Sequence, residues 1–444
     1  MSSALAILTL LVAPMVVGTA SVPRLPAGVR WAMGAVILCL AGLLLHGAGV
    51  SRAPARWFLG AAVLAGAVKC VVTPGSIRRS RVDPLLGLTF GLVAAAGTLL
   101  VLSHPVNAWD AVTIWYAKTR ALLAWRPPSA MPVPAYPELG PMGWSLVLAI
   151  ASPFAEPCGR LWFLGLYLAW LTSLSLWLPA RPSLQSRVVL ILAVLAQADL
   201  GSITNGYQDA VVMSVAGLSA ALLGSELLVA DEEKACPRGG RSHVASGLFL
   251  AGILGTIKAE GAVLGAILVG GWLITVAIVR GRRALVTSLP YVGVWLAASL
   301  VWPLLLVANG VRPSAFQSGA YGMVSADEVL ARLSRIPFIL YGFLRMGPWY
   351  ALPIVAAALA AGAAWRAVAT VRPVIAWLWG CAVAHSLWIV TVFLVTNLDF
   401  HWHVRTALDR LAFQHSFVWP MVTIVSVGAV LRHRSSSLSE TGRR

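Results

Sequence analysis

Residues 84–103 read PLLGLTFGLVAAAGTLLVLS, a run of twenty residues without a charged side chain. As a helix rising about 1.5 Å per residue it would measure roughly 30 Å, the thickness of the hydrocarbon core of a bilayer. Similar apolar runs recur along the chain between charged or turn-forming segments. Helices satisfy their backbone hydrogen bonds within one segment, whereas barrel strands would alternate polar and apolar residues, and no such alternation is seen. The sequence therefore predicts an all-α, polytopic transmembrane helical bundle that forms a single membrane domain over residues 1–444.

The composition excludes an ordinary soluble domain. Of the 444 residues, 59% are hydrophobic and 11% are charged, and the mean hydropathy is +0.82. A soluble domain carries about 25% charged residues, so this chain has too few charges to cover a surface that faces water. The net charge of +17 does not indicate nucleic-acid binding, because the basic residues stand singly or in small clusters at the ends of apolar runs. The five cysteines form no CxxC pair and predict neither a zinc site nor a disulfide framework.

Apolar stretches of sufficient length are the candidate membrane spans. They cover residues 3–20, 31–49, 57–73, 84–103, 161–178, 187–200, 209–229, 244–257, 261–279, 286–307, 348–364, 373–396 and 416–431. A further stretch at 141–155 is short and ends in Ser152-Pro153. It suits a half-helix that lies in the membrane without crossing it, and it leaves the number of crossings open.

Basic residues predict the orientation of the bundle, because Arg and Lys are enriched in cytoplasmic loops. They place four loops (104–140, 201–208, 308–335 and 397–415) on the outer face and the tail at 432–444 in the cytoplasm. The short loop with Arg52 and Arg56 falls outside under this scheme, against the rule. The basic clusters are Arg78, Arg79 and Arg81; Arg238 and Arg241; Arg280, Arg282 and Arg283; Arg366 and Arg372; and Arg432, Arg434, Arg443 and Arg444.

The first outer loop carries a carboxylate near its start, in Trp109-Asp110. Asp110 has two compatible interpretations: it is the N-cap of a following helix, or it acts as a general base or metal ligand at the end of a membrane helix. Glu138, where the chain re-enters the membrane, is either a helix-start charge or a second acid in a site. The residues after Asp110 have the pattern of an interfacial amphipathic helix: Ile114, Trp115, Lys118, Arg120, Leu122 and Trp125.

Charges also stand at two other outer junctions. Asp209 begins a span, where the helix macrodipole favours a carboxylate. Lys258 and Glu260 occupy a turn between two apolar runs, and charges at membrane depth are costly and tend to mark sites or pairs. The alternative for Lys258 is a cation that snorkels from an interfacial hairpin.

The last outer loop adds further cations. Arg410 is a candidate anion clamp, because guanidinium presents a rigid fork of donors to phosphate. Arg405 and Asp409 are four residues apart and can pair on one helix face. His401 and His403 have a spacing that could ligate a metal in extended chain, although such residues are more often interfacial hydrogen-bonding groups.

Segments in a particular order resemble bacterial multi-pass glycosyltransferases of the GT-C fold, relatives of the dolichyl-phosphate-mannose protein mannosyltransferases and lipid A aminoarabinose transferases. The resemblance covers roughly residues 84–420, and it implies a GT-C-like core in the bacterial inner membrane with its active site on the outer face. The segments are Trp109-Asp110 with Ile114-Trp115 and Lys118, Tyr136-Pro137-Glu138-Leu139, Gly206-Tyr207-Gln208-Asp209, Thr256-Ile257-Lys258-Ala259-Glu260-Gly261 and Leu408-Asp409-Arg410-Leu411.

The resemblance also implies a chemistry, the transfer of a sugar from a polyprenyl-phosphate-linked donor to a lipid, glycan or protein acceptor. Asp110 would deprotonate the acceptor hydroxyl or help to hold a divalent metal ion. The donor phosphate would face Lys258, Arg410 and Arg405, where cations stabilise the leaving group. The acceptor or metal environment would be shaped by Glu138, Asp209 and Glu260.

Two other functions remain open. A transporter or flippase of a lipid-linked intermediate predicts charged residues near the bilayer midplane and inverted repeats. The charges here stand at the outer ends of the predicted spans, and the sequence has no clear repeat. A non-catalytic scaffold predicts that Asp110 can be replaced without consequence. Membrane lipids are partners in every case.

Overall fold

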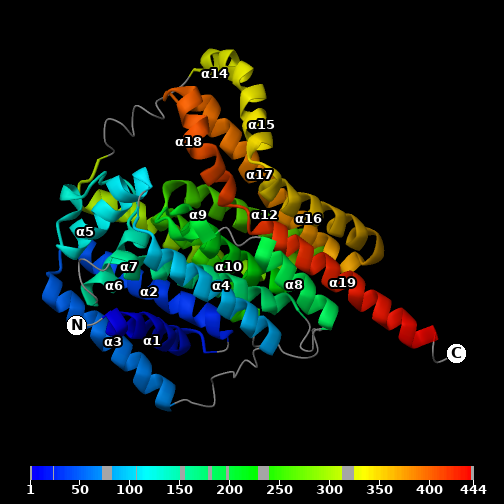
Figure 1. The fold of residues 1–444 in the computed structure, drawn as a ribbon, viewed down its shortest axis with the longest axis horizontal. Coiled ribbons are helices and arrows are strands. Elements are labelled where there is room, and N and C mark those ends of the chain that lie inside the picture. Colours follow the sequence, from blue (N-terminus) through cyan, green and yellow to red (C-terminus); the bar gives the residue numbers. More distant parts are fainter. Residues whose placement is uncertain are drawn as a thin grey trace.

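The computed structural model is helical throughout the residues that it describes (Figure 1). These are residues 3–23, 25–72, 83–106, 108–150, 156–178, 183–196, 200–228, 240–312 and 325–441. No strand occurs among them, so the predicted all-α fold is confirmed. The helices of the first half are α1 (Ser3–Ser21), α2 (Ala27–Gly47), α3 (Arg52–Val72), α4 (Pro84–Ser103), α5 (Ala117–Leu123), α6 (Leu139–Ile150), α7 (Glu156–Ser173), α8 (Leu184–Ala196), α9 (Leu200–Thr204) and α10 (Asp209–Leu228).

The second half of the chain contains the longest helices. They are α11 (Gly240–Ile257), α12 (Ala259–Ala308), α14 (Ala326–Arg332), α15 (Ile336–Arg345), α16 (Pro348–Ala367), α17 (Arg372–Val395), α18 (Phe400–Phe413) and α19 (Val418–Thr441). Short segments are the π-helix η2 (Ala111–Tyr116) and the 3-10 turns η3 (Pro128–Ala130), η4 (Leu174–Trp177), η6 (Leu333–Arg335) and η7 (Ala369–Val371).

Eight helical segments of the described chain are long and apolar enough to cross a membrane. This agrees with the prediction of a multi-pass membrane protein. The segments are Ala27–Gly47, Arg52–Val72, Pro84–Ser103, Asp209–Leu228, Ala259–Ala308, Tyr350–Ala367, Ala369–Val395 and Phe400–His433. Of the predicted cytoplasmic basic residues, the following lie outside the described residues: Arg78, Arg79, Arg81, Arg238, Arg443 and Arg444.

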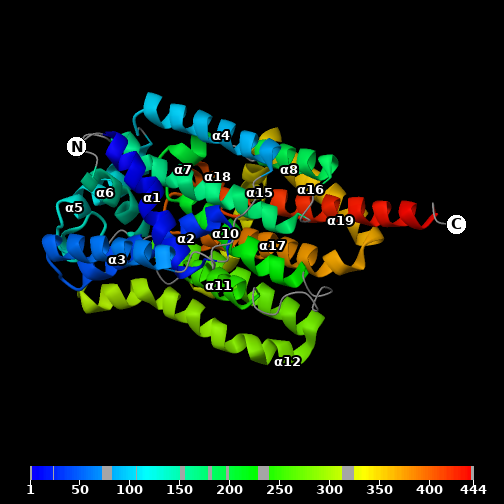
Figure 2. The same cartoon turned by 90° about the horizontal axis from the view of Figure 1, so that it is seen from below.

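The predicted spans 261–279 and 286–307 are the two halves of α12. The helix is interrupted at Gly281, whose φ of 77° and ψ of 177° are not helical. Glycine adopts a positive φ without steric penalty because it has no Cβ. Both halves pack closely on α11, and Figure 2 shows α12 along one edge of the molecule.

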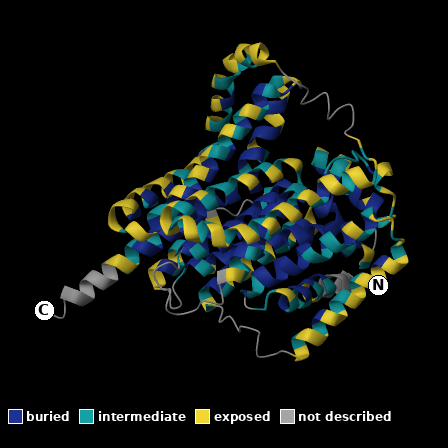
Figure 3. Ribbon diagram, turned by 180° about the vertical axis from the view of Figure 1, so that it is seen from behind, coloured by how far each residue is buried: buried dark blue, intermediate teal, exposed yellow. Residues whose placement is uncertain are grey.

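The central helix of the bundle is α10. Its residues 209–225 are all buried, and it packs against α7, α11, α12, α17 and α18. Figure 3 shows this buried centre surrounded by helices with exposed outer faces. A helix that is apolar on every side must lie inside a protein or in lipid, and α10 lies inside. In contrast, α3 exposes large apolar side chains such as Trp57 and Phe58.

The ambiguous stretch at 141–155 begins as α6, a helix of 12 residues. At about 1.5 Å per residue it measures roughly 18 Å, too short to cross the hydrocarbon core. This length fits the half-helix interpretation. Ser152 and Pro153, which end the stretch, lie outside the described residues.

Loop contacts gather at one end of the bundle, which we call the loop end. The indole nitrogen of Trp302 donates to the carbonyl oxygen of Ala135 at 3.2 Å, and this joins the end of α12 to the first predicted outer loop. Arg332 Nη2 donates to Asn397 Oδ1 at 3.0 Å and joins the other two long loops. That all of these loops lie on the outer face stays a prediction.

A smaller unit projects from the main bundle (Figure 1) and consists of α14, α15, α18 and the end of α17. Its apolar centre contains Ile339, Phe393, Val404 and Leu408. The predicted outer loop 308–335 is therefore partly helical. Its helix α14 begins with a capping box in which Ser325 and Glu328 each bond to the backbone of the other.

Gly252 of α11 is expected to be essential for the α11–α12 contact. A Cβ at this position would lie 2.7 Å from the Cβ of Ala298, closer than two carbon atoms can pack. We expect Gly252→Val to lower the stability of the purified protein by about 1–3 kcal/mol, the usual cost of overpacking. Thermal unfolding in detergent measures this change. Gly270→Val is the matched control, because nothing lies within 4 Å of a Cβ at Gly270, and equal losses in both variants would contradict the close contact.

Candidate functional site

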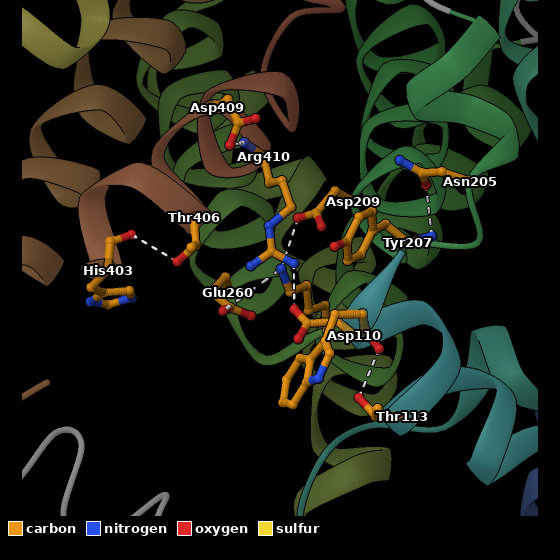
Figure 4. Close-up of polar contacts among 12 residues, drawn as sticks. Asp110, Thr113, Asn205, Tyr207, Asp209, Glu260, His403, Thr406, Asp409 and Arg410 are labelled. Carbon is orange, nitrogen blue, oxygen red and sulfur yellow. Dashed lines mark hydrogen bonds and ion pairs between the residues drawn. The ribbon is translucent and has the colours of Figure 1, made fainter. Parts of the chain in front are cut away.

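Most of the predicted site residues meet in one polar cluster at the loop end. The cluster combines Asp110 of the first loop, Asp209 at the start of α10, Lys258 between α11 and α12, Glu260 in the first turn of α12, and Arg410 of α18. Figure 4 shows the Arg410 side chain passing beside Asp209 and Tyr207 toward Asp110. These residues are far apart in the sequence, so the fold assembles the cluster.

Asp110 and Arg410 form an ion pair. Arg410 Nη1 donates to Asp110 Oδ2. The Arg410 side chain is 22% exposed and that of Asp110 is 24% exposed, so the pair is largely covered but not completely buried. Asp110 itself has helical backbone angles and makes no capping hydrogen bond, so the predicted N-cap is wrong.

The backbone after Asp110 departs from an α-helix. Residues Ala111–Tyr116 form the π-helix η2, a rare arrangement that is often found at functional sites. The wider turn changes the direction of the side chains around Asp110 relative to α5. The sequence pattern does not reveal this, because the apolar spacing fits an α-helix equally well.

Asp209 is the buried centre of the cluster. Its Oδ1 accepts from Lys258 Nζ at 2.8 Å and from Gln414 Nε2 at 2.6 Å. Glu260 lies farther from Lys258, with 3.9 Å between Oε1 and Nζ. Only 5% of the Asp209 side chain is exposed, so these donors replace the water that a carboxylate normally requires. Gln414 was not among the predicted site residues, and nothing in its sequence context marks it.

A sharp turn places Tyr207 beside Arg410. Gly206 has a φ of 88°, and the side chain of Asn205 accepts a hydrogen bond from the backbone N–H of Tyr207 at 2.9 Å. This Asn-Gly turn is a local arrangement that these two residue types favour. The Arg410 guanidinium carbon lies 4.7 Å from the centre of the Tyr207 ring, a cation–π contact.

Arg410 retains hydrogen-bonding capacity. Its Nε is buried and has no hydrogen-bond partner among the described residues. A guanidinium carries five N–H donors, and the side chain makes a hydrogen bond to Asp110 alone in the described structure. A buried donor without an acceptor is costly, so the site is suited to a ligand that brings oxygen atoms.

The surroundings of the cluster alter the ionisation of Lys258 and Tyr207, which lie outside the membrane-length segments. Burial opposes the charge of Lys258, but the carboxylates of Asp209 and Glu260 outweigh it, and the pKa of Lys258 is raised above its ordinary value. Burial also raises the pKa of Tyr207, although Arg410 acts in the opposite direction. At neutral pH the site therefore contains an ammonium group and an un-ionised phenol.

Glu138 lies in a second, separate ion pair. Its Oε1 accepts from Lys118 Nζ at 2.9 Å, and both side chains are almost completely buried. Burial lowers the pKa of Lys118, against the opposing effect of Glu138. Lys118 therefore does not face water. This contradicts the predicted interfacial amphipathic helix, in which Lys118 would lie on the polar face. The pair fixes α5 to the entry of α6, and the stacked rings of Trp115 and Tyr136 accompany it.

A buried arginine that was not among the predicted site residues anchors the start of the first loop. Arg160 of α7 donates to the carbonyl oxygens of Val101 at 3.1 Å, Thr204 at 2.7 Å and His104, and it pairs with Glu156. It thereby joins the ends of α4 and α9. An arginine one residue before the predicted span 161–178 was the available signal.

The remaining candidates do not join the cluster. Arg405 is exposed on α18, about 140° around the helix from Arg410, and no ion pair joins it to Asp409. The Nδ1 atom of His403 lies 3.1 Å from Thr396 Oγ1, while His401 is exposed. No group of three or more His, Cys, Asp or Glu residues that could hold a metal ion occurs in the described part of the chain.

Comparison of the chain with protein-family models, curated proteins and solved structures finds no match. The resemblance to GT-C glycosyltransferases therefore stands on the motifs quoted above, and the function is argued from the site.

We expect Lys118 and Glu138 to act as a structural unit. Lys118→Met leaves a buried carboxylate without its partner, which costs about 3–5 kcal/mol. The double variant Lys118→Met, Glu138→Met should recover most of this loss, because it removes both charges. Thermal unfolding of the two single variants and the double variant measures the coupling. A double variant no more stable than either single one would contradict a pairwise role.

Proposed function

We propose that this protein transfers a sugar from a polyprenyl-phosphate-linked donor to an acceptor on the outer face of the membrane. The observation that carries the proposal is the guanidinium of Arg410. It has an unpartnered buried Nε, stands in the same cluster as the ammonium of Lys258, and contacts the carboxylate of Asp110. Anion-binding groups and a candidate base therefore occur within one cluster.

The position of the cluster favours a lipid-linked substrate. Asp209 is the first residue of α10, and Lys258 directly precedes α12. Both helices are among the membrane-length segments, so the cluster lies where apolar helix surfaces end. A donor with an isoprenoid chain and a phosphate head has the corresponding distribution of apolar and charged groups. Guanidinium binds phosphate with two parallel hydrogen bonds, which fixes the orientation of the head.

The proposed reaction is a direct displacement at the anomeric carbon. An acceptor hydroxyl oxygen forms a bond to that carbon while the bond from the carbon to the phosphate oxygen breaks. Asp110 takes the hydroxyl proton, and the polyprenyl phosphate leaves with the bonding electron pair. Arg410 and Lys258 stabilise the negative charge that develops on the phosphate, and Asp110 acts as the general base.

Asp209 and Glu260 are proposed to hold the cations rather than to react. Asp209 is buried and shares one oxygen between Lys258 and Gln414, which fixes the direction of the ammonium group. Glu260 is more exposed, at 29% of its side chain, and is the more accessible of the two for an acceptor or a divalent metal ion.

Replacement of Asp110 tests the reaction directly. We expect Asp110→Asn to lower sugar transfer from radiolabelled polyprenyl-phosphate sugars by about 100-fold or more, the usual contribution of a general base. Asp327→Asn is the matched control, because Asp327 is an exposed carboxylate on α14. Transfer that is equal in wild type and Asp110→Asn would remove Asp110 as the base. Absence of transfer from every donor, with transport of the lipid-linked sugar instead, would favour a flippase.

The phosphate itself should dominate donor recognition. We expect sugar-free polyprenyl phosphate to inhibit transfer at a concentration at least about tenfold lower than polyprenol of equal length, because hydrogen bonds to charged groups add roughly 1.5–3 kcal/mol. Inhibition curves for the two lipids measure this ratio. Arg410→Gln should reduce the ratio toward one. A ratio near one in the wild type would show that the chain, and not the head, is recognised.

A further inference from the structure

Each cation of the cluster is already matched by a carboxylate. Lys258 is held by Asp209 and Glu260, and Arg410 is held by Asp110. An incoming phosphate therefore gains a full cation only by displacing a carboxylate. Asp209 and Asp110 are the two carboxylates that accept hydrogen bonds from these cations, and they differ in how easily they can be displaced.

Asp110 is the exchangeable one. Asp209 is 5% exposed and accepts from two donors on one oxygen, so its release would leave a buried charge without compensation. Asp110 is 24% exposed, and water can solvate its carboxylate after the pair separates. Asp110 directly precedes η2, and Arg410 belongs to α18. Each residue is therefore held in place by its own helical segment when the pair separates.

Tyr207 can guide Arg410 through such an exchange. The guanidinium carbon lies 4.7 Å from the centre of the ring, and this attraction does not depend on which acceptor the N–H groups have. The planar group can rotate on the ring face and keep that contact. Its buried Nε, which has no acceptor in the described structure, then gains one from the phosphate.

We propose that Arg410 exchanges between Asp110 and the donor phosphate, with Tyr207 as its support, so that donor binding releases Asp110 to act as the base. This inference rests on the proposed function and adds an order to it: the donor binds before the acceptor can be deprotonated. While Asp110 is paired with Arg410, its Oδ2 accepts a hydrogen bond from the guanidinium, and this oxygen is not available to an acceptor hydroxyl. The exchange thus keeps Asp110 paired with Arg410 until the donor is bound.

The exchange predicts that loss of Asp110 has opposite effects on binding and on transfer. If the pair holds Arg410 for about 80% of the time, the apparent affinity for donor is weakened about fivefold. Asp110→Asn should therefore bind polyprenyl phosphate about fivefold more tightly than wild type, although its sugar transfer is lowered by about 100-fold or more. Arg410→Gln should bind it more weakly. Quenching of tryptophan fluorescence by titrated polyprenyl phosphate in detergent gives these affinities, with Asp327→Asn as the unchanged control.

Variants of Tyr207 test whether its ring supports the Arg410 guanidinium. Tyr207→Phe keeps the aromatic face and should bind polyprenyl phosphate as wild type does. Tyr207→Leu removes the face and should weaken binding severalfold. Equal binding by these two variants would overturn the part assigned to Tyr207.

A measurement on the wild type keeps the proposal testable if Asp110→Asn does not fold. Modification of Asp110 by a water-soluble carbodiimide, read by mass spectrometry of its peptide, should increase when polyprenyl phosphate is added. Unchanged or reduced modification would overturn the exchange, as would equal or weaker binding by Asp110→Asn.

The two proposals fail in different ways. A wild type that transfers sugar, with Asp110→Asn binding no more tightly, leaves the proposed function standing and removes the exchange. A wild type that neither binds polyprenyl phosphate nor transfers any sugar removes both.

Discussion

A buried carboxylate at the head of the central helix constrains the rest of this molecule. Asp209 begins α10, which is buried along most of its length. An ion in such a place is tolerated only with a close partner and satisfied hydrogen bonds. Lys258 and Gln414 supply them, and each comes from a different part of the chain. The positions of the α11–α12 turn and of the junction between α18 and α19 therefore follow from the requirements of one side chain.

Two other buried ion pairs of the described bundle obey the same rule. Lys118 pairs with Glu138, and Arg160 pairs with Glu156 while it binds backbone carbonyls. All of these groups lie near the ends of helices, because an ion at the centre of a bilayer is costly. The loop end is consequently held by polar contacts, whereas the middle of the bundle is held by apolar packing. A site that must bind an anion can be formed where such contacts already concentrate.

The sequence predicts the fold better than the site. Bilayer thickness fixes the length of an apolar run, so the helical class and many spans were predictable, and the Arg280 cluster marked the turn at Gly281. The ion-pair partners of the charged residues were not predictable. A helix cap was one of the two interpretations of Asp110, and the residue instead binds Arg410. Lys118 was expected on the polar face of an interfacial helix, and it is buried. Both differences arise because the partner of a charge is decided by tertiary packing, which leaves no periodic signal in the sequence.

The bond between Asp110 and Arg410 has a consequence for the synthesis of the protein. The two residues are 300 positions apart. At about 5–20 residues per second, the ribosome needs roughly 15–60 seconds to make the second partner after the first. During this interval the membrane-insertion machinery contains a chain whose first loop is complete but whose Arg410 does not yet exist. A chain whose synthesis stops before Arg410 consequently lacks the pair, and only a chain synthesised beyond Arg410 can assemble the cluster.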